Sequence, residues 1–550
     1  MAMNVLVMLS GTASASAVAA QAVPVREVFS FRSMATVKSM KTTHCMVLNG
    51  KSRVGFVVDS GLSMMSSLTK GVMHAVDAVR SLEAETHDDA VESGSKPIHP
   101  VVGGGRPELF VGLPLDTVSN GKTVNHVKAI SAGLKALKLL GVDGVDVPVW
   151  WGVVEKENRG EYDWTSYLEL AQMIQDAGLK IHVSLYFHAS KFPGIPLPTW
   201  VSSIGDSDAN IYFADKQGNR NKECLSFGVD NLPVLAGKTP LQVYGDFCKN
   251  FQTTFAAFMS NNTITDVSIG LGPGGELRYP SMPAKKTEGG GVGEFQCYDK
   301  HMLNQLQKNA DECGNHYWGF CGPHDAPRYD ESPDAGNFFK DNGGSWETPY
   351  GDFFLTWYSN QLLSHGERLL SMASSVFGSS PVTLSGKIPV AHTWYKTRAH
   401  SSEQTAGYHN TDKRDGYDAV ADIFGRNSCR MILSGMEVAH DTQQALLDQI
   451  KKACQKHNVC VAGENSSISG EFTKIKDNIS ESSKVVSFTY QRMGATFFSP
   501  ENWPRFTEFV RSIRQPELHS DDVATGGEGS IALRTTVLAD NSSNRQMQSA

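Results

Sequence analysis

The sequence predicts an α/β protein, a (β/α)8 TIM barrel with long loops at the carboxyl ends of its strands. Three observations support this prediction. From Glu108 onward, short runs rich in Val, Ile and Phe alternate with longer amphipathic segments. The short runs are almost continuously apolar, as expected for parallel strands that are covered on both faces. Eight such units follow one another within roughly 400 residues, which fits one large barrel with insertions.

Eight strand candidates define the barrel. In chain order they are Leu109–Leu113, Gly144–Trp150, Ile181–Phe187, Ile264–Leu271, Val382–His392, Met431–Met436, Val459–Gly463 and Val485–Tyr490. A doubly wound open sheet is the alternative arrangement of the same elements. It is less favoured because no GxGxxG pattern follows the first strand.

Helix candidates lie between these strands. The segment Asn125–Leu140 has apolar residues on one face, and Gly141 follows as a helix-terminating glycine. The other expected helices are Tyr167–Asp176, Leu241–Met259, Lys300–Glu312, Phe353–Phe377, Gly416–Phe424, Ala445–His457 and Phe506–Ile513.

Two connections are much longer than the rest and predict where a site is built. They follow the third and the fourth strand, and the second contains two glycine-rich stretches, at 289–293 and 341–345. Long loops at the carboxyl end of a barrel usually form its site. We expect the barrel to span residues 105–515 and a polar, disordered tail to occupy 516–550.

The first 85 residues have a different composition from the barrel. Residues 1–82 hold eight Lys or Arg against three acids and are rich in Ser, Ala, Val and Met. This pattern is typical of an organelle transit peptide, so we expect a plastid leader and a location in the chloroplast stroma. A merely disordered tail is the alternative, and a secretory signal fits less well because no basic residue precedes the short apolar start.

Composition excludes several classes of function. The formal net charge of -8 argues against nucleic acid as a partner. No run of about 18 apolar residues exists, so no membrane span is expected. The nine cysteines form no CxxC pair and lack zinc-ligand spacing, which favours free thiols in a reducing compartment. Without a phosphate loop or a metal-ligand cluster, we expect no cofactor and no metal.

One turn carries the strongest chemical signal. Residues 270–280 read GLGPGGELRYP and follow an apolar strand, so Glu276 sits in a rigid glycine-proline turn. Glu464 ends a second apolar strand in VCVAGEN, at 459–465. Two carboxylates at the ends of two buried strands are the equipment of a glycosidase.

Other strand ends add cations, aromatics and polar groups to the same mouth. Flat sugar faces stack on aromatic rings, and sugar hydroxyls bond to placed polar groups. Several of these residues have an equally simple structural explanation as wall packing, a buried histidine or an interior ion pair. The set is Trp150, Trp151, His188, Arg278, Tyr279, Lys387, His392, Trp394, Ser434, Glu437, Asn465 and Arg492.

These segments resemble the plant β-amylases. GLGPGGELRYP is similar to the segment around their general acid, and VAGEN at 461–465 to that around their general base. GEFQCYDK at 293–300, FFLTWYSN at 353–360, and TAGY at 405–408 with RDGY at 414–417 are similar too. The resemblance covers most of the chain from Leu109 to Ile513.

The resemblance implies a function and assigns roles. It implies a barrel that removes maltose from the non-reducing ends of α-1,4-glucans such as starch, with inversion. Glu276 would be the general acid and Glu464 the general base, with the carboxyls roughly 6.5–9.5 Å apart to admit a water. The sugar-binding residues would be His188, Lys387, His392, Asn465 and Arg492, and Ser434 stands where the family has a threonine that touches the glucan.

Departures from the family pattern concern the substrate clamp. The family has an aspartate in strand two where this chain has Pro148, and Thr393 also departs from its pattern. The family's Gly-rich lid after strand three carries an aspartate, whereas here the segment 189–198 reads ASKFPGIPLP, short and without an acid. These losses resemble the plastid branch described as inactive, although that branch also alters the general base and Glu464 is intact here.

Two functions therefore remain open. The first is an active maltose-releasing hydrolase, indicated by both glutamates. The second is a weak or inactive homologue that binds glucan or regulates starch breakdown, with an active plastid amylase as a conceivable partner. A nuclear regulator is a remote third, since the leader has no dense basic block.

Overall fold

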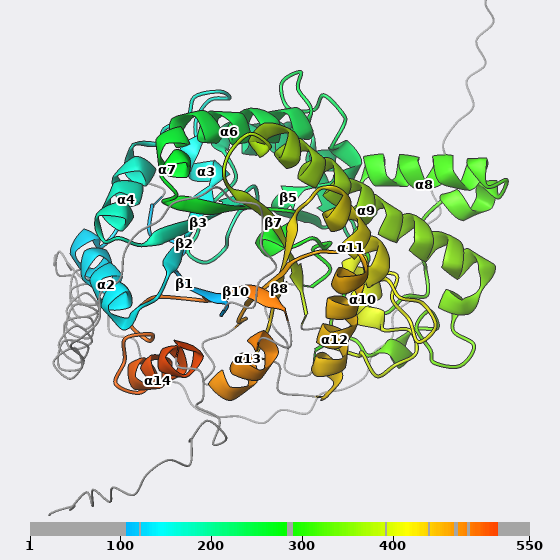
Figure 1. The fold of residues 1–550 in the computed structure, drawn as a ribbon. Coiled ribbons are helices and arrows are strands. Elements are labelled where there is room, and N and C mark those ends of the chain that lie inside the picture. The colour runs from blue at the N-terminus through cyan, green and yellow to red at the C-terminus, as the bar shows by residue number, and fades with distance from the viewer. Residues whose placement is uncertain are drawn as a thin grey trace, which may run out of the picture. The chain divides into compact units, whose positions relative to one another are not determined.

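Eight parallel strands close into a barrel, as the sequence predicts. The computed structural model describes residues 106–119, 123–282, 290–390, 393–437, 441–466, 471–480 and 484–514. Around the barrel the strand order is β1-β10-β9-β8-β7-β6-β3-β2 (Figure 1). The strands are β1 Glu108–Gly112, β2 Gly144–Trp150, β3 Lys180–Tyr186, β6 Ile264–Ile269, β7 Thr383–Pro389, β8 Arg430–Ser434, β9 Val461–Glu464 and β10 Val485–Tyr490. A closed, fully parallel ring excludes the doubly wound alternative.

Helices surround the ring of strands (Figure 1). Those nearest the sequence expectations are α2 Val127–Leu140, α4 Thr165–Asp176, α6 Pro240–Thr254, α7 Ala256–Ser260, α8 Lys300–Glu312, α9 Pro349–Phe377, α11 Tyr417–Arg426, α12 Asp441–Lys456 and α14 Asn502–Arg514. Their ends follow local chemistry. Gly141 ends α2 in a left-handed conformation, as predicted, and Thr239 and Gln242 form a capping box at α6.

Several short elements were not expected from the sequence. They are α3 Trp151–Val154, α5 Thr199–Ser207, α10 Ser401–Ala406, α13 Phe472–Ile479 and the two-stranded β4 Tyr212–Ala214 with β5 Arg220–Leu225. Short 3-10 turns join the elements at 209–211, 227–229, 273–275, 316–319, 333–335 and 345–347. Most of these elements lie in the long connections after β3 and β6 or directly after a strand.

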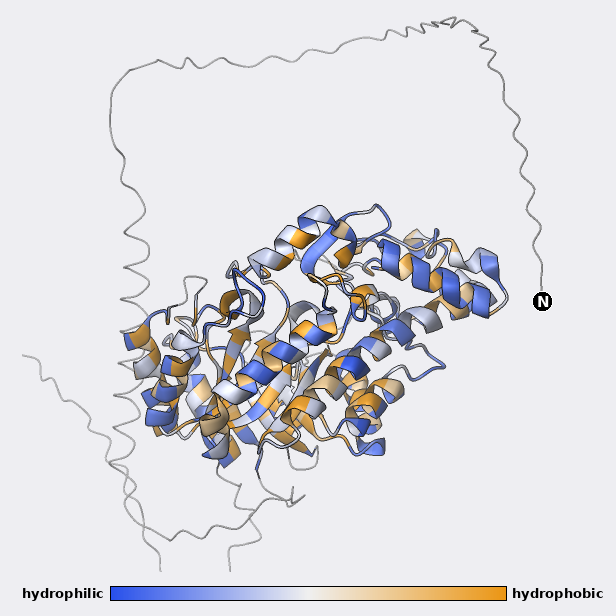
Figure 2. Ribbon diagram, turned by 90° about the horizontal axis from the view of Figure 1, so that it is seen from above, coloured by the Kyte–Doolittle hydropathy of each residue, from blue (hydrophilic) through white to orange (hydrophobic). Residues whose placement is uncertain are grey.

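Apolar residues fill the layer between strands and helices. Val147 and Val149 of β2 pack toward Tyr167 of α4 and Phe251 of α6. The helices accordingly present hydrophilic residues outward, and α8 is hydrophilic over most of its surface (Figure 2). No described helix is long and apolar enough to cross a membrane.

The inside of the barrel is polar. Near the amino ends of the strands, Arg430 donates to Asp266 (2.7 Å) and to Ser487 (3.4 Å). Because successive strand residues point to opposite faces, the apolar outer layer leaves every second residue to the interior. The interior residues nearest the carboxyl ends form the candidate site.

Candidate active site

Glu276 lies in a tight turn directly after β6. The turn requires glycine at Gly275, whose φ of 82° is in the left-handed region. A Cβ atom there would also lie 2.8 Å from Cε1 of Tyr186. Past the turn, the N–H of Leu277 donates to the carbonyl of Lys387 (2.8 Å), so Glu276 is bridged to β7. The backbone around Glu276 is thus fixed against two neighbouring strands.

Glu276 forms an ion pair with the arginine that follows it. Nε of Arg278 donates to Oε2 of Glu276 at 2.7 Å. A third carboxylate, Glu223 on β5, lies close by and accepts a hydrogen bond from the N–H of Gly274 (3.1 Å). Burial raises the pKa of Glu223, with Arg278 opposing this effect and Glu276 adding to it. Arg278 therefore contacts Glu276 directly and acts on Glu223 through its charge.

Glu464 ends β9 with both of its carboxylate oxygens bonded. Oε1 is 2.9 Å from the Lys387 ammonium and accepts a hydrogen bond from the Ser434 hydroxyl, also at 2.9 Å. Oε2 accepts from Nε2 of Gln491 at 3.1 Å. The predicted residues Glu464, Lys387 and Ser434 thus meet in one cluster on three adjacent strands, β9, β7 and β8.

Lys387 is a buried cation held by anions. Burial works against its charged form, but contact with Glu464 and the nearby Tyr186 and Asp146 outweigh it and raise the pKa of the ammonium. Nζ also lies 5.9 Å from the centre of the Tyr186 ring, within the range of a cation–π contact. Lys387 therefore carries a positive charge into the barrel mouth.

A second carboxylate joins the Glu464 cluster from below. Asp146 of β2 accepts from the Ser184 hydroxyl (2.7 Å) and from Nε2 of Gln491 (3.2 Å). Gln491 therefore links the two carboxylates. Its side chain has room because residue 112 is glycine, since a Cβ there would lie 2.2 Å from Oε1 of Gln491. Burial opposes the charge on Asp146, yet the nearby cationic groups and Ser184 lower its pKa.

His188 follows β3 and lies between the two carboxylate clusters. Burial, with the charges of Arg278 and Lys387, lowers the pKa of its imidazole to about 3. Its ring packs edge-on against Trp150 and Tyr186. Nδ1 is buried and has no hydrogen-bond partner among the described residues. A neutral imidazole with an unused nitrogen suits a sugar hydroxyl better than it suits an ion.

The remaining predicted sugar contacts are placed differently. Asn465 exchanges two hydrogen bonds with the backbone of Gln491, each of 2.7 Å. Arg492 donates to the carbonyl of Leu113 (2.7 Å). His392 lies outside the described residues. Asn465 and Arg492 thus join the ends of strands together, in addition to any role toward a ligand.

The described groups fit acid–base chemistry on a neutral substrate. No cluster of three or more His, Cys, Asp or Glu residues within the described ranges could hold a metal ion. Hydrolysis of a glycosidic bond requires a protonated carboxyl on one side and an ionised carboxylate that activates water on the other. Glu276 and Glu464 come from opposite ends of the series β6-β7-β8-β9, with Lys387 contacting both segments.

Comparison with known proteins identifies the family. The profile of glycosyl hydrolase family 14 matches residues 110–517, which include every barrel strand except the first two residues of β1. The chain belongs to glycosyl hydrolase family 14. It is 51% identical over 454 residues to "Inactive beta-amylase 9" of Arabidopsis thaliana, an alignment that covers 80% of this chain and 84% of that relative.

Further relatives of this family 14 chain include proteins named as enzymes. "Beta-amylase 2, chloroplastic" of Oryza sativa subsp. japonica is 41% identical over 454 residues, with 77% and 81% of the two chains covered. Among solved structures, the catalytic domain of beta-amylase from Paenibacillus polymyxa superposes with a TM-score of 0.62 at 26% identity. That match covers 74% of this chain and 99% of the bacterial one.

Pro148 lies in the inner wall of this family 14 barrel. Asp146 points into the barrel, and the two-residue period of a strand gives Pro148 the same orientation one level nearer the mouth. In β2, the residue one level below the mouth is thus a carboxylate, Asp146, and the residue at the mouth is Pro148 with its apolar pyrrolidine ring. Pro148 is buried in β2.

The long connection after β3 begins with a compact turn. Ser190 and Ile195 exchange both backbone hydrogen bonds, and the Ser190 hydroxyl donates to the carbonyl of Phe192 (2.7 Å). The turn then packs so closely on α3 that a Cβ at Gly152 would lie 1.9 Å from the carbonyl of Pro196. The short segment predicted from the sequence is therefore tied down and contains no acid.

Some candidates from the sequence serve the wall of the barrel. Trp150 and Trp151 are fully buried, and their indole N–H groups donate to the Leu115 carbonyl and to Glu155. Glu437 accepts hydrogen bonds from the backbone and the hydroxyl of Ser466. The structural explanation offered for these three residues is the one that their contacts support.

The sequence analysis overlooked Asp146, Glu223 and Gln491. Gln491 directly follows β10, so a full inspection of strand ends would have included it together with Arg492. Asp146 was visible as the single acid inside an apolar strand. Glu223 had no signal, because the contact between β5 and the Glu276 turn depends on the fold of a long connection.

Proposed function

We propose that this chain is a plastid glucan-binding member of the β-amylase family whose maltose-releasing activity is weak or absent. The observation that carries the proposal is the set of contacts that the Glu464 carboxylate makes. Both of its oxygens are bonded, to Lys387, Ser434 and Gln491. A general base has to accept a proton from water, and here three protein donors compete with that water for the lone pairs of the carboxylate.

The loss of the terminal clamp supports the same proposal. Pro148 offers no side-chain hydrogen bond to a sugar, and the turn after β3 carries no acid that could close over a substrate. Positioning and closure contribute roughly 7–11 kcal/mol to well-oriented reactions. Losing part of this contribution lowers the rate by many factors of ten, even with both glutamates in place.

Glucan binding is supported by the groups that remain at the mouth. Lys387, Ser434 and His188 supply a cation, a hydroxyl and a neutral imidazole beside aromatic side chains. The pairs formed by Glu276 and Glu464 add acceptors for sugar hydroxyls. We assign an α-1,4-glucan such as starch or maltodextrin as the ligand on the basis of family membership.

Hydrolysis is the second candidate function, and one observation favours it. Glu276 and Glu464, the residues that match the general acid and general base, are both present at the mouth of the barrel. The reaction would be inverting and would release maltose from non-reducing ends. It requires a protonated Glu276 carboxyl beside the Arg278 guanidinium, which contacts only Oε2.

Maltose release separates the two functions. We expect purified wild type to release maltose from soluble starch no faster than Glu464→Gln and Glu276→Gln, while all three sediment with starch granules. The Gln side chains keep the size of the carboxylates, and circular dichroism shows whether each variant is folded before it is assayed. Release by wild type clearly above both variants would establish the hydrolase and refute the proposal, and failure to sediment would refute glucan binding.

The plastid location rests on the leader and on the relatives named chloroplastic. A fluorescent fusion of residues 1–85 should enter chloroplasts, and the chain without them should stay outside. An active plastid amylase is the protein partner that we propose to look for. Affinity capture from stroma that recovers glucan but no amylase would leave the glucan role and refute this partner.

A further inference from the structure

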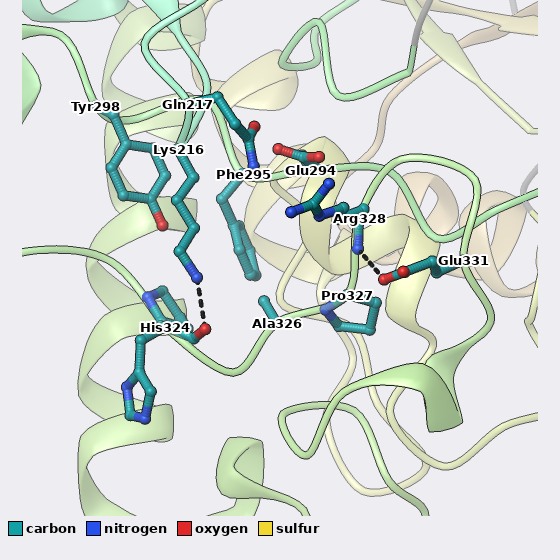
Figure 3. A pocket seen from close by; sticks show the side chains of 11 residues that line it. Lys216, Gln217, Glu294, Phe295, Tyr298, His324, Ala326, Pro327, Arg328 and Glu331 are labelled. Atoms are coloured by element: carbon teal, nitrogen blue, oxygen red, sulfur yellow. Dashed lines mark hydrogen bonds between the residues drawn. The ribbon is translucent and has the colours of Figure 1, made fainter. Parts of the chain in front are cut away.

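A second pocket lies outside the barrel mouth, among the long connections. It has a volume of about 250 Å³ and is formed by three segments of the chain. Lys216 and Gln217 come from the turn between β4 and β5, Glu294 from the segment before α8, and Arg328 from the segment before α9 (Figure 3). None of these residues belongs to the clusters around Glu276 and Glu464.

Hydrogen bonds hold the three segments together. Asp215 fixes the β4–β5 turn by accepting from two backbone N–H groups, and it also accepts from the Tyr329 hydroxyl (3.1 Å). The Gln296 amide donates to the same hydroxyl (2.7 Å). Lys216 donates to the carbonyl of His324. The pocket is therefore preformed and needs no rearrangement to keep its shape.

Glu294 is the unusual member of the lining. It is 7% exposed, and its Oε1 accepts only a long hydrogen bond from the Tyr329 N–H (3.3 Å). Its Oε2 has no hydrogen-bond partner in the described part of the chain. Buried acceptors are nearly always satisfied in proteins, so an unsatisfied one needs an explanation. A ligand hydroxyl that donates to this carboxylate is such an explanation.

Donors and acceptors converge near Glu294. Figure 3 shows the Gln217 amide, the Glu294 carboxylate and the Arg328 guanidinium directed toward one another at one end of the pocket. In the ranges that the structure describes, neither the side-chain amide of Gln217 nor the guanidinium of Arg328 forms a hydrogen bond. Tyr298 and Ala326 are half-buried, line the pocket as well and supply apolar surface.

The charges of the pocket select the class of ligand. Lys216 and Arg328 balance Glu294 and Glu331, so the lining is neutral as a whole. An anion would meet Glu294, and a cation would meet Arg328 and Lys216. A neutral ligand with several hydroxyl groups and an apolar face fits all of these groups at once. The volume lies just below the range of about 300–1,000 Å³ for drug-sized ligands, which suits one or two sugar rings.

We propose that this pocket is a second carbohydrate site that holds a glucosyl unit of an α-glucan. Sugar hydroxyls donate to Glu294 and accept from Gln217 and Arg328, and the apolar face of the ring lies on Tyr298 and Ala326. That the sugar belongs to a glucan rests on the proposed function. The existence of a carbohydrate site does not, because it follows from the lining itself.

Binding of maltohexaose to variants of the full-length chain tests the proposal. Isothermal titration of wild type should give two sites. Arg328→Ala and Glu294→Gln should each weaken one site at least tenfold, and Lys387→Ala or His188→Ala should weaken the other. Lys308→Ala on the exposed face of α8 is the matched control and should change neither. Circular dichroism and melting temperature show that each variant is folded.

The outcomes are distinguishable. If Arg328→Ala and Glu294→Gln bind as wild type does, the second site is refuted while glucan binding at the mouth stands. If only the Lys387 and His188 variants bind as wild type does, the mouth site fails and the second site stands. Competition by inorganic phosphate at the second site would refute its assignment to a neutral ligand.

Discussion

Single residues at the barrel mouth show how charge is distributed over this site. Glu276 and Glu464 each contact a cation, Arg278 and Lys387 respectively, so neither carboxylate stands alone. The sequence predicted both glutamates and Lys387, because each lies at or past the end of an apolar strand. It could not predict that Gln491 bridges Glu464 to Asp146. This contact depends on the closure of the barrel by β1 and β10, which brings β2 and β9 near each other.

The Lys387–Glu464 pair should contribute strongly to folding stability. Its side chains are 6% and 9% exposed, and removing one partner leaves an uncompensated buried charge. We expect Lys387→Met to lower the free energy of unfolding by about 3–5 kcal/mol. The double variant with Glu464→Gln should lose less than the sum of the two single variants, as measured by urea unfolding.

The exposed pair Lys308 and Glu312 on α8 is the control for this cycle. Its side chains are 78% and 60% exposed, so the same substitutions should show little coupling. Additive losses at Lys387 and Glu464 would contradict a direct interaction in the folded protein.

His188 should make stability depend on acid pH. The imidazole has a pKa of about 3 in the folded chain against an ordinary value of 6.5, so between these values the unfolded chain binds more protons. Stability is therefore fully present at neutral pH and falls as the pH drops below about 6.5. From pH 7 to pH 5 the loss is about 2 kcal/mol.

His188→Gln isolates this contribution. The difference in unfolding free energy between wild type and the variant should change by that amount between pH 7 and pH 5 in urea titrations. A constant difference would mean that the imidazole titrates normally in the folded protein.

Among the elements, the turn after β6 is the one that the sequence described best. Its glycines predicted a rigid turn, and Gly275 indeed needs both a left-handed conformation and space for Tyr186. The eight strands were predicted because they are apolar on both faces. The hairpin β4–β5 and the helices α5 and α13 were missed, since they are short and their stability comes from contacts within long connections.

Gly275→Ala should be more harmful than its conformation alone implies. Gly160 has nearly the same φ, 83° against 82°, but a Cβ there would have nothing within 4 Å. Both variants bear the strain of a left-handed alanine, about 1–2 kcal/mol. Gly275→Ala should cost at least about 1 kcal/mol more, since the new methyl group overlaps Tyr186.

Urea unfolding of the two alanine variants measures this difference. Equal losses of stability would show that the turn relaxes away from Tyr186 without cost. Because the turn holds Glu276, Gly275→Ala should also weaken maltohexaose binding at the mouth, whereas Gly160→Ala should not.

At the scale of the whole molecule, every strand and described helix of the barrel lies between residues 106 and 514. We therefore expect residues 105–515 to fold alone and to melt at the same temperature as the full chain. A shorter chain, 105–484, lacks β10 and leaves β1 and β9 with one unpaired edge each, so it should not give a cooperative thermal transition. A lower melting temperature for residues 105–515 would assign stabilising contacts to the termini.

The barrel is closed by the pairing of β1 with β10, in the register Glu108 with Ser487 through Val111 with Tyr490. These partners are about 380 positions apart, so the ring forms only after nearly the whole domain has been synthesised. At 5–20 residues per second, β1 waits about 20–75 s on the ribosome for its neighbour. During that time its edge is open to pairing with other chains. Long-range contacts of this kind also slow folding, so we expect the newly made protein to aggregate more readily than the finished barrel, which has no open strand edge.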